Sequence, residues 1–304
     1  RGDLLPNSDV DLLVLIDDAI LSDTQRLKIN TAVECWIGSL WDIGLAPSHS
    51  VRTVSECVAF CHEDLASQTA VLEARFLAGD SSVFQSFTQQ FFADFDLQAF
   101  WRNKLAEMRA RYARFEDTPF SLEPNCKESP GGLRDLHLIL WLSKAAHLAK
   151  SWHDLQEIGW LNDKQARLIQ KCETRMLAIR ACLHVLTRRA ENRLLFDLQT
   201  SLAQAFGLND SDGKRASELL MQKYYIAARV NSVRMNLFLQ KFDEYMAPAN
   251  TPPIAHKIKG FPDFVEVNHE LDIKRDDLFV RKPYLLLDVF YVFDSRRWLT
   301  QRSY

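Results

Sequence analysis

Two aspartates near the start of the sequence, Asp9 and Asp11, have the residue type and the spacing for metal-dependent chemistry on a phosphate. They open the segment 9–16 (DVDLLVLI), whose alternating pattern predicts a β-strand. Alternate side chains of a strand share a face, so both carboxylates would stand together, opposite an apolar face. Carboxylate oxygens suit Mg²⁺, and two divalent ions about 4 Å apart can activate a hydroxyl and hold a triphosphate. Such a pair alone is usually solvent-exposed acid, but with Arg1, Gly2 and Asp3 before it and an apolar strand after it the pattern favours transfer of a nucleotide from a nucleoside triphosphate.

A third carboxylate would complete such a metal site, and the sequence offers two candidates. The segment 69–77 (TAVLEARFL) also alternates, which predicts a third strand with Glu73 on its polar face. Glu73 is our candidate for the third ligand, and Asp64 is the alternative. Glu73 could instead form a structural ion pair with Arg75 or Arg52, in which case it would not reach the metal.

The elements that must position these carboxylates read as a small α/β unit. The spacing of apolar residues predicts helices over 24–41 and 55–64, with a second strand at 48–53. Beyond Asp80 the strand signals nearly vanish and long helical patterns follow. These further helices are predicted roughly at 82–115, 134–149, 163–190 and 214–245.

The sequence thus predicts an α+β fold, in which a small mixed sheet, incomplete at its N-terminal end, precedes a large all-α domain. We expect a nucleotidyltransferase domain at 1–80, a helical domain at 81–246 and a C-terminal segment at 247–304. This last segment opens with proline-rich turns, and its apolar stretch 283–293 reads as a connection toward a further domain. The chain begins without methionine inside an expected loop, so we also expect a segment upstream of Arg1.

The composition narrows the class of protein. Of 304 residues, 47% are hydrophobic, and 37 basic against 40 acidic residues give a net charge of −3. This balance lacks the basic surplus of proteins that bind DNA or RNA, so we expect a mononucleotide ligand rather than a nucleic acid polymer. No run reaches the ~18 apolar residues of a membrane span, and the cysteines read as reduced thiols, which points to the cytoplasm. Cys57 and Cys61 beside His62 could suggest a metal cluster, but their spacing better fits the buried side of a helix.

A long proline- and glycine-rich loop ends in Gly131 and Gly132, directly before a predicted helix. Backbone N–H groups at a helix start can bind anions. With Lys127 and Arg134 nearby, they make a candidate phosphate site. The alternative is a tight turn, in which Asp135 complements the helix dipole.

Two further pairs of polar residues could have either a functional or a structural role. His184 and Arg188 lie four residues apart, so on a helix they would share a face that meets a triphosphate or forms a solvated ion-pair network. His49 and Arg52, on the second predicted strand, could lie near the nucleotide or be structural. Tyr224 is expected in a core or an interface.

Several blocks of this sequence resemble one protein family. The opening block RGDLLPNSDVDLLVLI is similar to the nucleotidyltransferase signature of the DNA polymerase β superfamily. From Arg1 to about Val292, the blocks resemble, in the same order, the bacterial PII uridylyltransferase/uridylyl-removing enzymes. The further blocks are LWDIGLAPSHSVRT (40–53), TAVLEARFLAGD (69–80), EPNCKESPGGLRDLHLILWL (123–142), LHVLTRRAENRLLFDLQ (183–199) and LMQKYYIAARVN (220–231).

The resemblance implies a polymerase β-like nucleotidyltransferase domain followed by an associated helical domain. Its implied activity is transfer of UMP from UTP to a tyrosine of the PII signalling protein, with release of pyrophosphate. Asp9 and Asp11 would then hold two Mg²⁺ ions, while Glu73 would bind the catalytic ion and lower the pKa of the tyrosine. The residues that would bind the nucleotide are Arg1, Gly2, Ser8, Lys127, Gly131, Gly132 and Arg134.

The sequence also departs from this family. The family's glycine-rich turn, which lies just upstream of the position of Arg1, is absent, and Asp3 stands where glutamate is common. His256 and His269 lack the His-Asp dipeptide of the family's hydrolase domain, so uridylyl-removing activity and glutamine sensing are not expected in this chain. Because the carboxylates do not identify the base, a protein adenylyltransferase of the glutamine synthetase type is the alternative enzyme. A non-catalytic module that binds nucleotide or docks PII is the alternative from another class.

Overall fold

The computed structural model of the chain describes residues 4–18, 22–45, 47–211, 213–247, 255–267, 270–275 and 277–296. The chain divides into two compact units, Arg1–Phe242 and Asp243–Tyr304. Two of the candidate nucleotide-binding residues, Arg1 and Gly2, lie outside the described residues. The same holds for Asp3 and His269.

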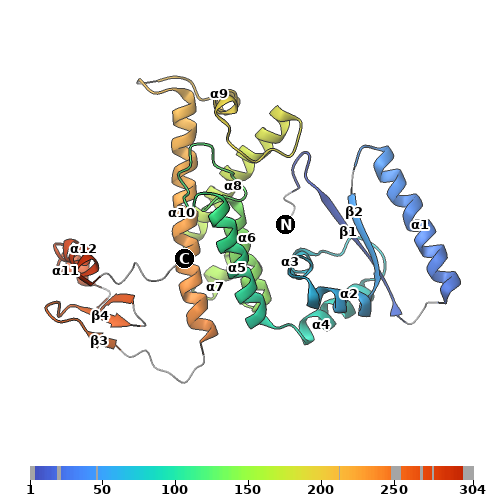
Figure 1. Cartoon of the computed structure of the whole chain (residues 1–304), viewed down its shortest axis with the longest axis horizontal. Helices are drawn as coiled ribbons and strands as arrows, with labels where there is room; N and C mark the ends of the chain where they lie inside the picture. Colours follow the sequence, from blue (N-terminus) through green and yellow to red (C-terminus); the bar gives the residue numbers. More distant parts are fainter. Residues whose placement is uncertain are drawn as a thin grey trace. The chain divides into compact units, whose positions relative to one another are not determined.

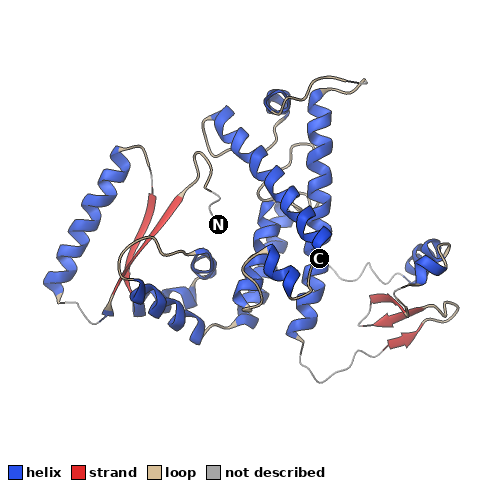
Figure 2. Ribbon diagram, turned by 180° about the vertical axis from the view of Figure 1, so that it is seen from behind, coloured by secondary structure: helices blue, strands red, loops and turns tan. Residues whose placement is uncertain are grey.

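The N-terminal part of the first unit is built on two parallel strands, β1 (Val10–Ile16) and β2 (Pro47–Thr53). Parallel strands need a crossover connection, and helix α1 (Asp23–Asp42) supplies it, on the opposite side of the pair from α2 and α3 (Figures 1 and 2). Exposed and less exposed residues alternate at the start of β1. Asp9, just before the strand, and Asp11 lie on its exposed side. The predicted strand with both carboxylates on one face is therefore confirmed.

The predicted third strand at 69–77 is wrong, because this segment forms the end of a helix and an irregular stretch after it. Two short helices follow β2, namely α2 (Val54–Glu63) and α3 (Leu65–Glu73). The carboxylate of Asp64 accepts a hydrogen bond from the backbone N–H of Ser67 at 2.7 Å and so caps α3. Thr69 and Leu72 are buried, three residues apart, as a helical period requires.

Helices make up the remainder of the first unit, the last of them running past its boundary at Phe242. They are α4 (Ser81–Ala93), α5 (Leu97–Arg114), α6 (Leu133–Ala145), α7 (Trp152–Glu157), α8 (Asp163–Thr187), α9 (Phe196–Ala205) and α10 (Ala216–Met246). The helix predicted over 82–115 is two helices, because Asp96 accepts a hydrogen bond from the N–H of Ala99 at 2.8 Å and caps α5. The other three predicted long helices are present, whereas α7 and α9 were not predicted.

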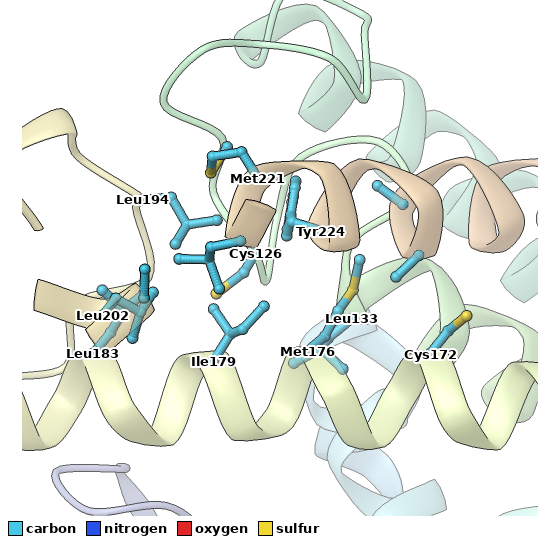
Figure 3. Packing of buried hydrophobic residues seen from close by; sticks show 14 of the residues in the cluster. Cys126, Leu133, Cys172, Met176, Ile179, Leu183, Leu194, Leu202, Met221 and Tyr224 are labelled. Atoms are coloured by element: carbon cyan, nitrogen blue, oxygen red, sulfur yellow. The ribbon is translucent and has the colours of Figure 1, made fainter. Parts of the chain in front are cut away.

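A buried core lies between α8 and α10. Figure 3 shows Met176 and Ile179 of α8 opposite Tyr224 of α10, with Cys126 and Leu133 between the two helices. Each of these five side chains is at most 1% exposed. This packing confirms the core position expected for Tyr224, and it fixes the loop before α6 against both long helices.

Beyond the end of α10, the described residues of the second unit form three antiparallel strands and two helices. These are β3 (Ala255–Lys257), β4 (Phe264–Val267), β5 (Glu270–Ile273), α11 (Leu278–Arg281) and α12 (Leu285–Arg296). Phe264, Leu278, Leu285 and Val292 are buried in its small core. The stretch 283–293, which we expected to be a connection, is therefore mostly helix α12, and it contributes to this core.

Candidate nucleotide-binding site

A tight turn directly precedes the two aspartates. The N–H of Ser8 donates to the carbonyl oxygen of Leu5 at 3.0 Å, and the N–H of Leu5 donates to Ser8 Oγ at 3.0 Å. Asn7 adopts a left-handed conformation with φ of 59°. The hydroxyl of Ser8 thus closes the turn that leads into Asp9 and Asp11.

The two aspartates suit a hard divalent cation. Their side chains lie two residues apart on the exposed side of β1. Mg²⁺ keeps several water ligands and is usually bound by one or two carboxylates together with substrate phosphates. Within the part of the chain that the structure describes, no group of three or more His, Cys, Asp or Glu side chains is arranged to hold a metal. Asp9 and Asp11 thus have the chemistry of Mg²⁺ ligands, and their role as a metal site stays a prediction.

Glu73, the candidate for the third carboxylate, lies at the end of α3 and is bound to α6. Its Oε1 accepts hydrogen bonds from Trp141 Nε1 at 2.9 Å and from Lys144 Nζ at 3.0 Å. Lys144 Nζ also donates to the carbonyl oxygen of Leu72 at 3.2 Å. These contacts join the end of α3 to α6, which is a structural role for Glu73.

Asp64, the alternative third carboxylate, is also engaged in local structure. Hydrogen bonds from the hydroxyl and the backbone N–H of Ser67 lower its pKa. Among the described residues, neither Asp64 nor Glu73 forms a three-carboxylate group with Asp9 and Asp11. The third ligand thus stays a prediction that these contacts do not favour.

Four cations lie near Glu128. Three of them, Lys127, Arg134 and Arg180, we call the basic cluster; the fourth, Arg111, is paired with Asp135. Arg134 Nη2 lies 3.0 Å from Glu128 Oε1, and Lys127 Nζ lies 3.9 Å from the same oxygen. Burial lowers the pKa of Lys127 and of Arg180, while the negative charge of Asp9 acts on both in the opposite direction. Within the basic cluster, the charge of Asp9 thus acts on Lys127 and on Arg180.

The backbone N–H groups of residues 131–134, at the start of α6, all donate within the chain. Their acceptors, in chain order, are Asp135 Oδ2 and the carbonyl oxygens of Ser129, Cys126 and Lys127, at 2.7, 2.8, 3.0 and 2.9 Å. A phosphate cradle at Gly131 and Gly132 would need free N–H groups, and this described loop has none at these positions. The contacts thus support the tight-turn interpretation, and phosphate binding by the two glycines stays a prediction.

The buried side chain of Asp135 stabilises this loop. Its fully buried carboxylate accepts hydrogen bonds from Arg111 Nη2 and from the Tyr112 hydroxyl, both at 2.6 Å. Burial raises the pKa of Asp135, and the Arg111 guanidinium opposes that change. Arg111 Nη1 also donates to the carbonyl oxygen of Glu128 at 2.6 Å. The buried pair therefore anchors to α5 the loop that carries Lys127.

Helix α8 contacts the turn that precedes the aspartates. His184 Nδ1 donates to the carbonyl oxygen of Pro6, and Asn7 Nδ2 donates to the carbonyl oxygen of His184 at 3.3 Å. His184 is fully buried, and its Nε2 has no hydrogen-bond partner among the described residues. The prediction that His184 and Arg188 share one face of a helix is wrong, because Arg188 lies past the end of α8 with φ of 54°.

Two other sequence candidates have structural contacts. Arg52 Nε donates to Ser50 Oγ at 2.9 Å, and its guanidinium lies 3.9 Å from the ring centre of Phe60. Cys57 and Cys61 are 3% and 2% exposed on α2, which confirms the predicted buried side of a helix.

Two contributors to the site were missed from the sequence, Arg180 and Asn7. The available signal for Arg180 was its spacing of four residues from His184, which places both on one side of a helix. No comparable signal marked Asn7, because its contact with α8 joins residues 177 positions apart.

Comparison with known proteins was informative along the whole chain. Residues 99–238 match the family described as GlnD PII-uridylyltransferase. The chain is 43% identical over 303 residues, its full length, to the bifunctional uridylyltransferase/uridylyl-removing enzyme of Bordetella avium (strain 197N). Enzymes of the same description from Burkholderia mallei (strain SAVP1) and Burkholderia pseudomallei (strain K96243) are 40% identical over 297 residues, which is 98% of the chain. The chain spans about a third, 34%, of the length of each of these relatives.

The matched regions include the site. The family match contains the basic cluster and His184, and the match to the Bordetella avium enzyme extends to Asp9 and Asp11. None of the described helices combines the length and the hydropathy needed to cross a membrane. These findings confirm that the chain resembles, over its whole length, the PII uridylyltransferase/uridylyl-removing family.

Proposed function

We propose that this chain is the nucleotide-transferring part of a PII uridylyltransferase. It would move UMP from UTP to a tyrosine hydroxyl of the PII signalling protein and release pyrophosphate. The observation that carries the proposal is the pair Asp9 and Asp11, exposed together at the start of β1, where the preceding turn is hydrogen-bonded to the helix that carries Arg180. The choice of a uridylyl donor rests on the names of relatives that are 40–43% identical, and the choice of PII on the description of the family that matches residues 99–238, since two carboxylates do not select a base.

The residues of the chain have defined parts in this reaction. Asp9 and Asp11 would hold two Mg²⁺ ions, which, when bound, favour ionisation of the attacking hydroxyl and neutralise the triphosphate. The tyrosine oxygen forms a bond to the α-phosphorus, the bond from that phosphorus to the oxygen of the β-phosphate breaks, and the tyrosine proton passes to water. Such a transfer needs little covalent help from the protein, so the chain contributes positioning and electrostatic stabilisation.

A test of the third carboxylate follows from the contacts of Glu73. To bind a metal, Glu73 would have to leave Trp141 and Lys144. If Glu73 is a ligand, Glu73→Gln raises the Mg²⁺ concentration needed for UTP binding. If its role is to join α3 to α6, the variant lowers the melting temperature and leaves the Mg²⁺ dependence unchanged, which would remove Glu73 from the proposed site.

The proposal as a whole is tested by calorimetric titration of the chain with UTP and with ATP, at several Mg²⁺ concentrations. The matched variant is Asp9→Asn/Asp11→Asn, which keeps the size of both side chains and removes their charge. We expect UTP to bind only with Mg²⁺, and binding to disappear in the double variant.

Other outcomes lead to other functions. Binding of ATP but not UTP would indicate a protein adenylyltransferase. Metal-independent binding that survives in Asp9→Asn/Asp11→Asn would indicate a module that retains nucleotide without transferring it. Binding of neither nucleotide by the unaltered chain would overturn the proposed function.

A further inference from the structure

Arg180 of α8 is held beside the loop that carries Lys127. Its Nε donates to Asn192 Oδ1 at 2.6 Å. The carbonyl oxygen of Asn192 in turn accepts from the N–H of Cys126 at 2.8 Å. A short antiparallel bridge between Asn125 and Arg193 extends this pairing of the two segments. One side-chain and one backbone hydrogen bond therefore connect Arg180, through Asn192, to the residue beside Lys127, although Arg180 and Lys127 are 53 positions apart in the sequence.

The same helix fixes Arg180 relative to the aspartates. One turn further along α8, His184 is hydrogen-bonded to Pro6 and Asn7, in the turn before Asp9. Residues four apart on a helix lie on one side of it. The guanidinium of Arg180 consequently lies on the side of α8 that faces the start of β1, and the charges of Arg180 and Asp9 interact.

The basic cluster carries more positive charge than its neighbours neutralise. Glu128 forms ion pairs with Lys127 and Arg134, and also lies 3.9 Å from the Nε of buried Arg111. No ion pair joins the guanidinium of Arg180 to a carboxylate of the described residues; its hydrogen bond goes to the neutral amide of Asn192. Arg180 is half-buried and has no carboxylate partner among the described residues. The planar fork of N–H groups on such an arginine is well suited to bind a phosphate.

We propose that Arg180, with Lys127 and Arg134, binds the β- and γ-phosphates of the nucleoside triphosphate whose α-phosphate lies at Asp9 and Asp11. This inference rests on the proposed function for the identity of the substrate. It adds Arg180 as a binding residue and assigns the basic cluster to the pyrophosphate leaving group. The cluster would stabilise the negative charge that this group gains as the bond to the α-phosphorus breaks.

The test compares Arg180→Gln with Arg167→Gln in the full chain. Both changes remove one positive charge from α8, but Arg167 is exposed, pairs with Asp163 and lies about 20 Å from Arg180 along the helix axis. The probes are UTP, UMP and inorganic tripolyphosphate, each titrated calorimetrically with Mg²⁺. Losing a charge-assisted hydrogen bond typically weakens binding roughly tenfold to a hundredfold.

We expect Arg180→Gln to weaken the binding of UTP and of tripolyphosphate by this factor and to leave the affinity for UMP unchanged. Arg167→Gln should change none of the three affinities. An equal loss of affinity for UTP and UMP, or no loss of affinity for UTP, would overturn the role of Arg180 and leave the proposed function intact. Tripolyphosphate binding that depends on Arg180, without any preference for a nucleotide, would support the cluster and overturn the proposed function. Lys127→Gln is the second variant if Arg180→Gln lowers the melting temperature by more than Arg167→Gln does, and the same pattern of affinities is expected of it.

Discussion

Gly131→Ala is a sharp test of how the loop before α6 is held. Gly131 has φ of +75°, and a Cβ built on it would lie 2.1 Å from the carbonyl oxygen of Ala228 on α10. The left-handed conformation costs a residue with a Cβ about 1–2 kcal/mol. Relieving the overlap in a packed core costs roughly another 1–3 kcal/mol. The substitution should therefore reduce the free energy of unfolding by about 2–5 kcal/mol.

The control for Gly131→Ala is Gly159→Ala, because the two glycines have nearly the same backbone conformation in different surroundings. Gly159 has φ of +74°, but no heavy atom lies within 4 Å of its hypothetical Cβ. Urea unfolding followed by tryptophan fluorescence would measure both variants, and Gly159→Ala should lose only the conformational part, about 1–2 kcal/mol. If the two variants differ by less than about 0.5 kcal/mol, the close approach to Ala228 is not what requires glycine, and the reasoning from packing fails.

Two further predictions concern elements around the site. Asp64→Ala should destabilise the chain by about 1 kcal/mol through loss of the α3 cap. Hydrogen bonds from Ser67 lower the pKa of Asp64, so the stabilisation is complete above the ordinary aspartate pKa near ~3.9 and is lost as the pH falls through the lower folded value. The difference between wild type and variant in urea titrations should therefore shrink under acid conditions, and a difference that grows there would contradict the cap. His184→Leu removes the donor to Pro6 and should speed amide hydrogen exchange in residues 5–9. Val185→Ser, at an exposed neighbouring position, should leave the exchange rates unchanged. Equal exchange rates in both variants would show that the hydrogen bond from His184 does not stabilise this turn.

Local features of this chain were predictable from its sequence. The strand that carries Asp9 and Asp11 was predictable because its side-chain alternation is set by the backbone itself. The segment 69–77 also alternates, but Asp64 caps a helix that runs into it, and a cap outweighs a short alternating run. Similarly, a single aspartate at the start of α5 divided a predicted long helix into two.

Features that depend on distant contacts were not predictable. Gly131 and Gly132 read either as a phosphate loop or as a tight turn, and no local signal reveals the close approach of Gly131 to Ala228 on α10. Arg180 gave only a spacing signal, since its neighbour Lys127 is brought to it by a bridge between two loops. Glu73 has the residue type of a metal ligand, but Trp141 and Lys144 on another helix decide where its carboxylate points.

The residues of the proposed nucleotide site come from two parts of the first unit. The aspartates come from the strand pair, whereas Lys127, Arg134 and Arg180 come from the helical part of the same unit. A triphosphate needs both, because carboxylates alone repel phosphate, and the two aspartates offset part of the positive charge of the Mg²⁺ ions that they would hold. The turn at Pro6 and Asn7 is bonded directly to α8, so the same helix that carries Arg180 also sets the position at which β1 begins. On the proposed function, the helical part therefore belongs to the nucleotide site, and we expect residues 1–80 alone to present the aspartates without the cations of the basic cluster.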